Sequence, residues 1–161
     1  MRRKEREVTD TNKINEIILR CDCCRIALNT EKAPYIVPLN FGYTSDLPTF
    51  YFHGAKEGRK MNLINHNPFV GFELDTNGRV VGDGEACNYS YYYQSVIGTG
   101  KITIVEDLSE KQSAFQLIMK QYTGKDNWDI PENALQATTI LKLEVEEMSC
   151  KEHMEQPKQT A

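Results

Sequence analysis

The fold is indicated most clearly by residues 49–60, which read TFYFHGAKEGRK. Aromatic and β-branched residues at the start of this stretch predict a strand over 49–53, because such side chains suit a pleated, half-buried surface. Two glycines then interrupt the pattern, and a short helix is expected over 59–65 before the Asn-Pro pair at 67–68 ends it. The central expected unit is therefore a strand that runs through a glycine-containing loop into a helix.

The loop and the first helical turn carry three cations, Lys56, Arg59 and Lys60, in a chain that is acidic overall. Arg59 and Lys60 stand where the helix macrodipole disfavours positive charge. A bound anion would remove this conflict, because the basic side chains and the helix N-terminal amides would both point at it. Gly54 and Gly58 allow close approach to the backbone. The segment thus predicts an anion site, and a solvated basic loop is the alternative.

Period-two alternation of apolar residues continues on both sides of this unit. Strands are expected over 24–28, 35–41, 69–74, 95–105 and 140–145. Pro38 places its strand at a sheet edge or a bulge, because proline cannot donate a ladder hydrogen bond. Asn77-Gly78 and Gly82-Asp83-Gly84 are turn signals, so 75–84 is expected to be a turn.

Two further helices are expected, one before the strand at 24–28 and one after the strand at 95–105. Asp10 is a plausible N-cap for a helix over 11–20, and Ser109 begins a capping-box pattern for a helix that ends near Gly124. No regular βαβ repeat occurs, so the sheet should be mostly antiparallel. The expected fold class is mainly β with short α-helices, six or seven strands forming a closed or nearly closed barrel. One domain is expected over 1–150, followed by a polar, disordered tail over 151–161.

The bulk properties exclude several classes of protein. The chain has 161 residues, of which 40% are hydrophobic and 26% charged, as expected for a folded globular protein. A formal net charge of -4 and a pI of about 5.4 argue against a nucleic-acid partner that depends on broad phosphate attraction. No apolar run is long enough to span a bilayer, and the charged N-terminus leads into no signal-peptide core. We therefore expect a cytoplasmic protein without nucleic-acid or membrane partners.

The cysteines point to no metal. Cys21, Cys23, Cys24, Cys87 and Cys150 are an odd number without an export signal, which favours reduced thiols. A zinc site needs two ligand pairs, and neither the cluster at 21–24 nor the run 150–153 has a second pair at zinc-like spacing. We therefore expect no metal ligands. A catalytic Cys-His pair has no local signature that would single out a nucleophile.

Two aromatic features remain open in function. His53 ends its strand beside the anion site, where its imidazole could donate to a phosphate or a substrate, or simply be a hydrogen-bonded strand-end histidine. Tyr89, Tyr91, Tyr92 and Tyr93 precede the strand at 95 and could line an aromatic ligand pocket or a subunit contact.

Together these segments resemble the FMN-binding split-barrel superfamily that includes pyridoxamine 5'-phosphate oxidase, and within it the nitroimidazole-resistance (Nim) proteins most. The similar stretches are PYIVPLNF at 34–41, YFHGAKEGRK at 51–60, and Ser95-Val96-Ile97 leading to Gly100-Lys101. The resemblance covers about residues 2–151 and implies a six-stranded antiparallel split β-barrel. It also implies a homodimer that holds FMN in a groove at the subunit interface.

The resemblance also assigns roles to residues. The cofactor-binding residues that it implies are Val37, Pro38, Leu39, Asn40, His53, Gly54, Ala55, Arg59, Lys60, Gln94 and Ser95. The first four would run along the flavin ring, Arg59 and Lys60 would pair with the phosphate, and Gln94 and Ser95 would approach from the partner subunit. In Nim-type proteins a histidine beside the flavin is implicated in activity, and His53 is the implied catalytic residue. Related sequences often carry a basic residue where Gln94 stands.

The function that this resemblance implies is that of an FMN-dependent oxidoreductase. A reduced nicotinamide or another small-molecule donor would reduce the flavin, which would pass electrons to a small acceptor such as a nitroaromatic compound. The residues that recognise pyridoxal phosphate near the C-terminus of the true oxidases have no clear counterpart, so vitamin B6 oxidation is not expected. A non-catalytic redox sensor or flavin reservoir is the alternative, and haem in the same groove is a third hypothesis.

Overall fold

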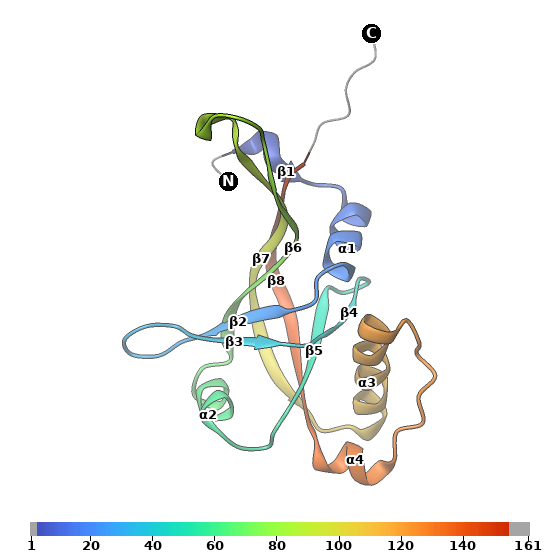
Figure 1. Cartoon of the computed structure of the whole chain (residues 1–161). Helices are drawn as coiled ribbons and strands as arrows, with labels where there is room; N and C mark the ends of the chain where they lie inside the picture. Colours follow the sequence, from blue (N-terminus) through green and yellow to red (C-terminus); the bar gives the residue numbers. More distant parts are fainter. Residues whose placement is uncertain (1–2, 155–161) are drawn as a thin grey trace.

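The structure is a computed structural model and describes residues 3–154. Its elements, in chain order, are the 3-10 turn η1 (Lys4–Arg6), β1 (Glu7–Val8), α1 (Thr11–Leu19), β2 (Cys24–Leu28), β3 (Tyr35–Leu39), β4 (Gly42–Thr44), β5 (Thr49–Gly54), α2 (Arg59–His66), β6 (Phe69–Val81), η2 (Ala86–Asn88), β7 (Ser90–Val105), α3 (Leu108–Thr123), α4 (Glu132–Ala137) and β8 (Thr139–His153). The strands pair antiparallel in the order β3-β2-β6-β7-β8-β5-β4, with β1 added to β8. Figure 1 shows the long strands β6, β7 and β8 crossing the shorter ones, with α3 and α4 on one side.

The expectation of a mainly antiparallel β fold with short helices is confirmed. Within residues 3–154 the sheet has eight strands rather than six. Two of them, β1 with two residues and β4 with three, are too short to show a period-two pattern in the sequence. The remaining six, from the five residues of β2 to the 16 of β7, correspond to the six strands expected from the sequence.

The two end strands of the sheet order are consecutive in the chain and leave backbone groups unpaired on their outer sides. β3 lies at one end of the strand order and β4 at the other. Pro38 is therefore on an edge strand, as expected. Proline has no N–H to donate, and an edge strand tolerates this because it has a neighbouring strand on one side only. β4 pairs with β5 only over Thr49–Tyr51, so the end of β5, from Phe52 to Gly54, is bonded on one side only, to β8.

The barrel interior is filled by aromatic and aliphatic side chains around Phe50. The Phe50 ring, which is fully buried, lies 5.6 Å from the ring of Phe41, 4.9 Å from Tyr43, 6.4 Å from Phe52 and 5.2 Å from Phe72. A second, smaller cluster lies under α3 and consists of Val105, Ala114, Ile118 and Ile140. The two clusters lie on opposite faces of the sheet.

The helix ends follow ordinary capping chemistry, with one correction. Asp10 caps α1 as expected, since its Oδ1 accepts from the Lys13 amide at 2.8 Å. The N-cap of α3 is Asp107 rather than Ser109, and its carboxylate accepts from the Glu110 amide at 2.8 Å. The expectation failed because two capping residues stand two positions apart and only one of them precedes the first helical turn.

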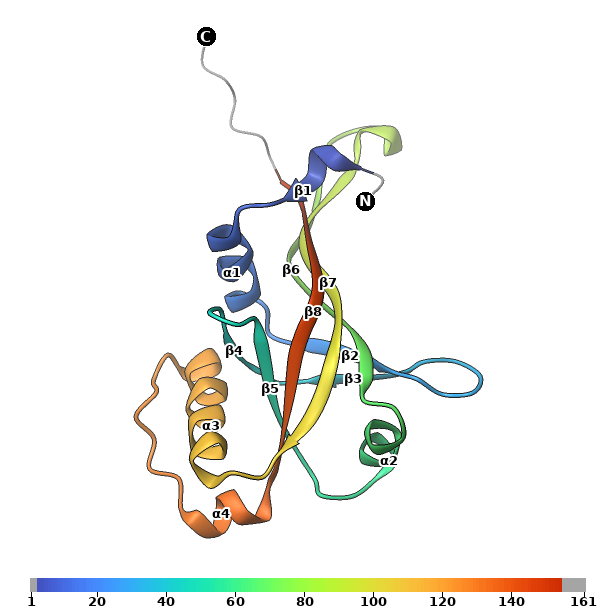
Figure 2. The same cartoon turned by 180° about the vertical axis from the view of Figure 1, so that it is seen from behind.

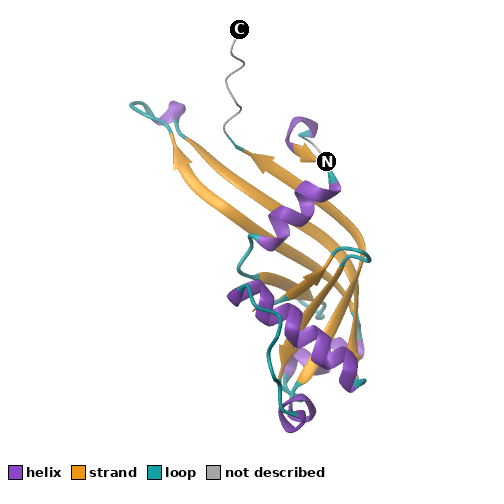
Figure 3. Ribbon diagram, turned by 90° about the vertical axis from the view of Figure 1, so that its right-hand side faces the viewer, coloured by secondary structure: helices purple, strands orange, loops and turns teal. Residues whose placement is uncertain are grey.

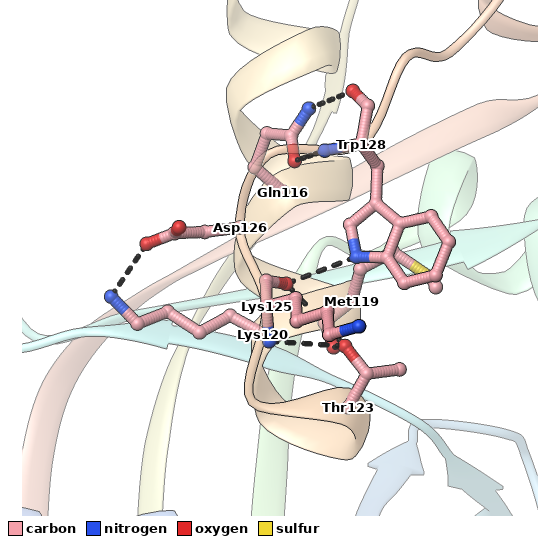
Figure 4. A network of polar contacts seen from close by, with 7 residues as sticks. All are labelled: Gln116, Met119, Lys120, Thr123, Lys125, Asp126 and Trp128. Atoms are coloured by element: carbon pink, nitrogen blue, oxygen red, sulfur yellow. Dashed lines mark hydrogen bonds and ion pairs between the residues drawn. The ribbon is translucent and has the colours of Figure 1, made fainter.

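Polar contacts at the C-terminus of α3 fix the loop that follows (Figure 4). Gln116 receives the Trp128 amide at 3.0 Å and donates to the Trp128 carbonyl at 2.6 Å. The Trp128 indole donates to the Lys125 carbonyl at 3.0 Å, and Lys120 pairs with Asp126 at 2.9 Å. Gly124 takes a φ of 72° and ends the helix as expected.

Beyond the barrel, β6 and β7 continue as a two-stranded arm that projects from the rest of the molecule (Figures 1, 2 and 3). The turn expected at Asn77-Gly78 is wrong, because these residues lie inside β6 at a bulge, where Asn77 has a φ of 57°. The reversal comes later, where Gly82 and Gly84 take φ of 139° and 69°. The Tyr91 phenol lies directly against Gly78, so a side chain at this position would have to displace it.

The C-terminal strand is longer than expected. β8 continues to His153, so Lys151, Glu152 and His153 are paired with β7 rather than part of a tail. Residues 155–161, the rest of the expected tail, lie outside the described residues. None of the helices within residues 3–154 is long and apolar enough to cross a membrane.

Candidate functional site

The predicted anion site lies where β5 passes into α2. The last strand residue is Gly54, and α2 begins at Arg59 after Gly58, whose φ of 122° and ψ of 175° suit glycine. The Gly58 carbonyl accepts the Asn62 amide at 3.1 Å, but no side chain caps the helix N-terminus. The first-turn amides are thus left to bind water or an anion.

Lys60 lies directly over Gly54. A Cβ built on Gly54 would be 2.9 Å from Lys60 Nζ, so the absence of a side chain at this glycine makes room for the ammonium group. The Lys60 side chain is half-buried, and burial lowers the pKa of its ammonium. Within residues 3–154 it forms no ion pair or hydrogen bond with another side chain or carbonyl. A partly buried cation without a counter-charge favours a bound anion.

Arg59, next to Lys60, turns toward the edge strand instead. Its guanidinium carbon lies 4.2 Å from the centre of the Tyr35 ring on β3, a cation-π contact. Arg59 also borders a hollow of about 630 Å³ between α2 and the β2–β3 loop. The other residues that line the hollow are Asn29, Thr30, Glu31, Lys32, Leu63, His66 and Asn67. Tyr35 has no sequence signal as a site residue, because its contact with Arg59 exists only once α2 is placed against β3.

His53 and Ala55 flank Gly54 along the free edge at the end of β5. Both side chains are exposed. His53 pairs with Ile140 across the sheet, and its ring forms no hydrogen bond within residues 3–154. The structure therefore brings Lys60 onto Gly54, with Arg59 reaching β3, whereas His53 precedes Gly54 in the same strand and so projects its side chain to the opposite face of β5.

The four predicted residues at 37–40 present backbone rather than side chains at this edge. Val37 and Leu39 pack partly against the core, while Pro38 and Asn40 are exposed. Because β3 pairs with β2 alone, the backbone on its other side is open to a ligand.

Gln94 and Ser95 are not part of this place within one chain. Val105 pairs with Ile140, which pairs with His53, whereas Ser95 lies ten residues away on β7 (105 against 95). At about 3.3 Å per residue this is a path of roughly 33 Å along β7.

The Gln94 side chain is also occupied internally. It is 4% exposed, accepts from Asn77 at 2.6 Å and donates to Glu152 at 2.7 Å. Only Ser95, which is half-exposed, keeps a side chain that could face another molecule.

Three of the five cysteines, Cys21, Cys24 and Cys150, are buried and held in the thiol form. Burial raises the pKa of Cys21 to about 12 and that of Cys150 to about 11, and it also raises the pKa of Cys24. In the described part of the chain, no three His, Cys, Asp or Glu side chains gather in a way that could hold a metal ion.

Comparison with known proteins places the chain in a family. Residues 10–152 match the family described as pyridoxamine 5'-phosphate oxidase. Among proteins with curated descriptions no significant match was found.

Solved structures share the fold. A protein of Bacteroides thetaiotaomicron, provisionally assigned to 5-nitroimidazole antibiotic resistance, is 32% identical with a TM-score of 0.79, over 90% of this chain and 85% of that one. The flavocytochrome Anf3 of Azotobacter vinelandii is 18% identical with a TM-score of 0.80, over 98% of this chain and 73% of that one. The FAD and heme binding protein of Mycobacterium smegmatis is 16% identical with a TM-score of 0.79, over 96% of this chain and 77% of that one. Because the family match covers residues 10–152 and a solved structure with the same fold is 32% identical, the chain belongs to the pyridoxamine 5'-phosphate oxidase family of split-barrel proteins.

Proposed function

We propose that this protein binds FMN with the phosphate on the N-terminus of α2 and acts as an FMN-dependent oxidoreductase. The observation that carries the proposal is the Lys60 ammonium, which is half-buried over Gly54 and has no counter-charge among the described residues. The fold supports a flavin in particular, because two structures that share it are a flavocytochrome and a protein named for binding FAD and heme. The resemblance to Nim proteins favours FMN and a small nitroaromatic acceptor.

Each part of the site has a task in this proposal. Arg59 and Lys60 hold the phosphate, and the open backbone of β3 from Val37 to Asn40 runs along the ring system. When bound, the flavin supplies the redox chemistry, taking electrons from a reduced nicotinamide and passing them to the acceptor. His53 directly precedes Gly54 and has an exposed imidazole, and we assign it the transfer of a proton from an imidazole nitrogen to the reduced acceptor.

A second candidate is a flavin-binding module without turnover, a redox sensor or reservoir. One observation favours it: within residues 3–154 no group hydrogen-bonds to His53 and orients its ring, as a third residue commonly does for a catalytic histidine.

A visible spectrum followed by anaerobic mixing with NADH or NADPH separates these functions. The oxidoreductase predicts a yellow protein, after FMN addition if necessary, whose flavin band bleaches rapidly with one of the two donors. A loaded protein that no donor bleaches supports the module. A protein that takes up no flavin contradicts both the oxidoreductase and the module. An intense haem band would show that the groove holds haem instead of flavin.

We further propose that two copies form the flavin site, through the outer face of the sheet. Ile36, Phe69 and Ile97 are 61%, 50% and 50% exposed. The strand register puts all three on this outer face. Ile36 pairs with Ala27, which pairs with Gly71, so Ile36 shares the face of Gly71. Phe69 and Glu73 each lie two residues from Gly71 and therefore point to the same face, as does Ile97, the partner of Glu73. A hollow of about 280 Å³ beside Ile97 could receive a partner's side chain.

Ile97→Glu tests this interface. Burying a carboxylate against apolar side chains is costly, so the dimer dissociation constant should rise at least roughly tenfold and FMN retention should fall with it. Sedimentation velocity at several concentrations measures the first, and the flavin content of the purified protein the second. Leu47→Glu is the control, since Leu47 is 79% exposed in the β4–β5 turn. An Ile97→Glu protein that dimerises like the parent would contradict the proposed interface.

The pH dependence of FMN affinity should report on Lys60. Burial lowers the pKa of its ammonium from the ordinary 10.5 in the free protein, whereas a bound phosphate raises it. The affinity is thus complete below the free-state pKa and falls as the pH rises from there to the bound-state pKa. Titrations between neutral pH and pH of about 10 should show this fall in the parent, and a flat profile in Lys60→Arg, because arginine stays charged. An equal fall in both would assign it to the flavin ring instead.

A further inference from the structure

A third cavity, of about 410 Å³, lies at the end of the barrel where the β5–α2 loop, α3 and α4 come together. Figures 1 and 2 show α2 and α4 at this same end. It is lined by Lys56, Met61, Ile104, Glu106, Leu108, Lys111, Gln136 and Thr139. None of the residues assigned to the flavin is among them, and the volume is within the ordinary range for small-molecule sites.

The strongest feature of this cavity is a buried lysine. Lys111 is 8% exposed, and its only recorded acceptor within residues 3–154 is the Thr138 carbonyl, at 3.3 Å from Nζ. No carboxylate among those residues lies within ion-pair distance of it. An ammonium group has three donors, so two remain for other partners.

The Thr138 contact gives Lys111 a structural role without satisfying it. Thr138 is the C-cap of α4, where a cation meets the negative end of the helix macrodipole. A buried charge with one neutral acceptor is still under-compensated, since desolvation is repaid mainly by an opposite charge and by full hydrogen bonding. The fold therefore keeps a cation at the wall of a cavity, where an anion would complete its partners.

The other lining residues indicate what kind of anion fits. Lys56, from the basic segment singled out in the sequence but not needed for the flavin, adds a second positive charge, and Glu106 adds a negative one. The net charge of the lining is +1, which favours a monoanion over a dianionic phosphate. Ile104 and Leu108 are 36% and 38% exposed, so apolar surface is also open to a ligand.

We propose that this cavity binds a small organic monocarboxylate with a compact apolar body. Its carboxylate lies between Lys56 and Lys111, and its apolar part packs against Met61, Ile104 and Leu108. The cavity borders the proposed phosphate site, since Thr139 is the strand partner of Gly54 and Met61 follows Lys60, but it shares no lining residue with that site and the proposal does not depend on the function proposed above.

Calorimetric titration with benzoate tests this site, with benzamide as the neutral probe of the same shape and inorganic phosphate as the probe without an apolar body. We expect saturable binding of benzoate, and binding at least roughly tenfold weaker for each of the others. Equal binding of benzamide, binding of phosphate at least as strong as that of benzoate, or no binding of benzoate would overturn the proposal.

Two variants locate the binding. Lys111→Met keeps the apolar stem and removes the charge, and we expect it to weaken benzoate binding at least tenfold while FMN binding stays unchanged. Lys60→Met should do the reverse. If Lys111→Met fails to fold, Lys56→Met, in an exposed loop, provides the same test with a smaller expected loss. Unchanged benzoate affinity in the folded variants would place the binding elsewhere and refute the assignment.

Discussion

Replacing Lys60 with methionine is expected to weaken FMN binding by about 1.5–3 kcal/mol, or roughly 10- to 150-fold. The loss follows from the position of the ammonium group over Gly54, where it is half-buried and has no counter-charge of its own within the described chain. A charge-assisted hydrogen bond to a phosphate is among the strongest single polar contacts that a binding site can make. Methionine keeps most of the apolar stem, so the packing over Gly54 changes little.

The matched control for this variant is Lys56→Met. Lys56 is four residues away in the same basic segment, but it lines the cavity at the end of the barrel rather than the Gly54 site. Fluorescence quenching of FMN measures both affinities, and the unfolding temperature shows whether each variant is folded. A Lys60→Met protein that is folded and binds FMN like the parent, or an equal loss in Lys56→Met, would move the phosphate away from α2.

Phe50→Ala is expected to lower the free energy of unfolding by about 4 kcal/mol. Phe50 is fully buried, and its ring contacts those of Phe41, Tyr43, Phe52 and Phe72. Removing the ring leaves a cavity that these large, rigid neighbours cannot fill. A loss of this size is a substantial part of the total stability of a small domain.

Chemical denaturation in urea measures this effect, with Leu47→Ala as the exposed control. The control should change the free energy of unfolding by less than about 0.5 kcal/mol, because Leu47 is 79% exposed. A Phe50→Ala protein as stable as the control would mean that the barrel interior is not packed around this ring.

Local chemistry explains which parts of the fold could be predicted from the sequence. The helix over Thr11–Leu19 carries its own cap at Asp10 and its own apolar stripe. β2 alternates strictly between buried and more exposed residues, and Pro38 by itself restricted β3 to an edge or a bulge. In these elements the pattern and the tertiary packing agree.

The parts that could not be predicted depend on contacts between distant segments. Asn77-Gly78 has the composition of a turn, but pairing with β7 keeps it in a strand as a bulge. The helix at Glu132–Ala137 has only six residues, too few to show a period of 3.6, and it was missed. β6, β7 and β8 are longer than expected because their polar outer ends are held by neighbouring strands rather than by apolar alternation.

The candidate site shows the same division. The positions of Gly54, Arg59 and Lys60 follow from one continuous segment, so charge and glycine spacing were enough to place them together. Tyr35 beneath Arg59 comes from another strand and had no sequence signal. The roles that the resemblance implies for Gln94 and Ser95 would require a second copy of the chain, and the buried side chain of Gln94 would leave only its backbone and Ser95 available for them.

The central claim is that a flavin phosphate binds at the N-terminus of α2, and paired titrations with FMN and riboflavin test it most directly. The two ligands share the ring system and the ribityl chain and differ only in the phosphate. If Arg59 and Lys60 hold that phosphate, FMN should bind at least roughly 100-fold more tightly than riboflavin, and Lys60→Met should remove most of the difference. Equal affinities for FMN and riboflavin in the parent protein would contradict the account.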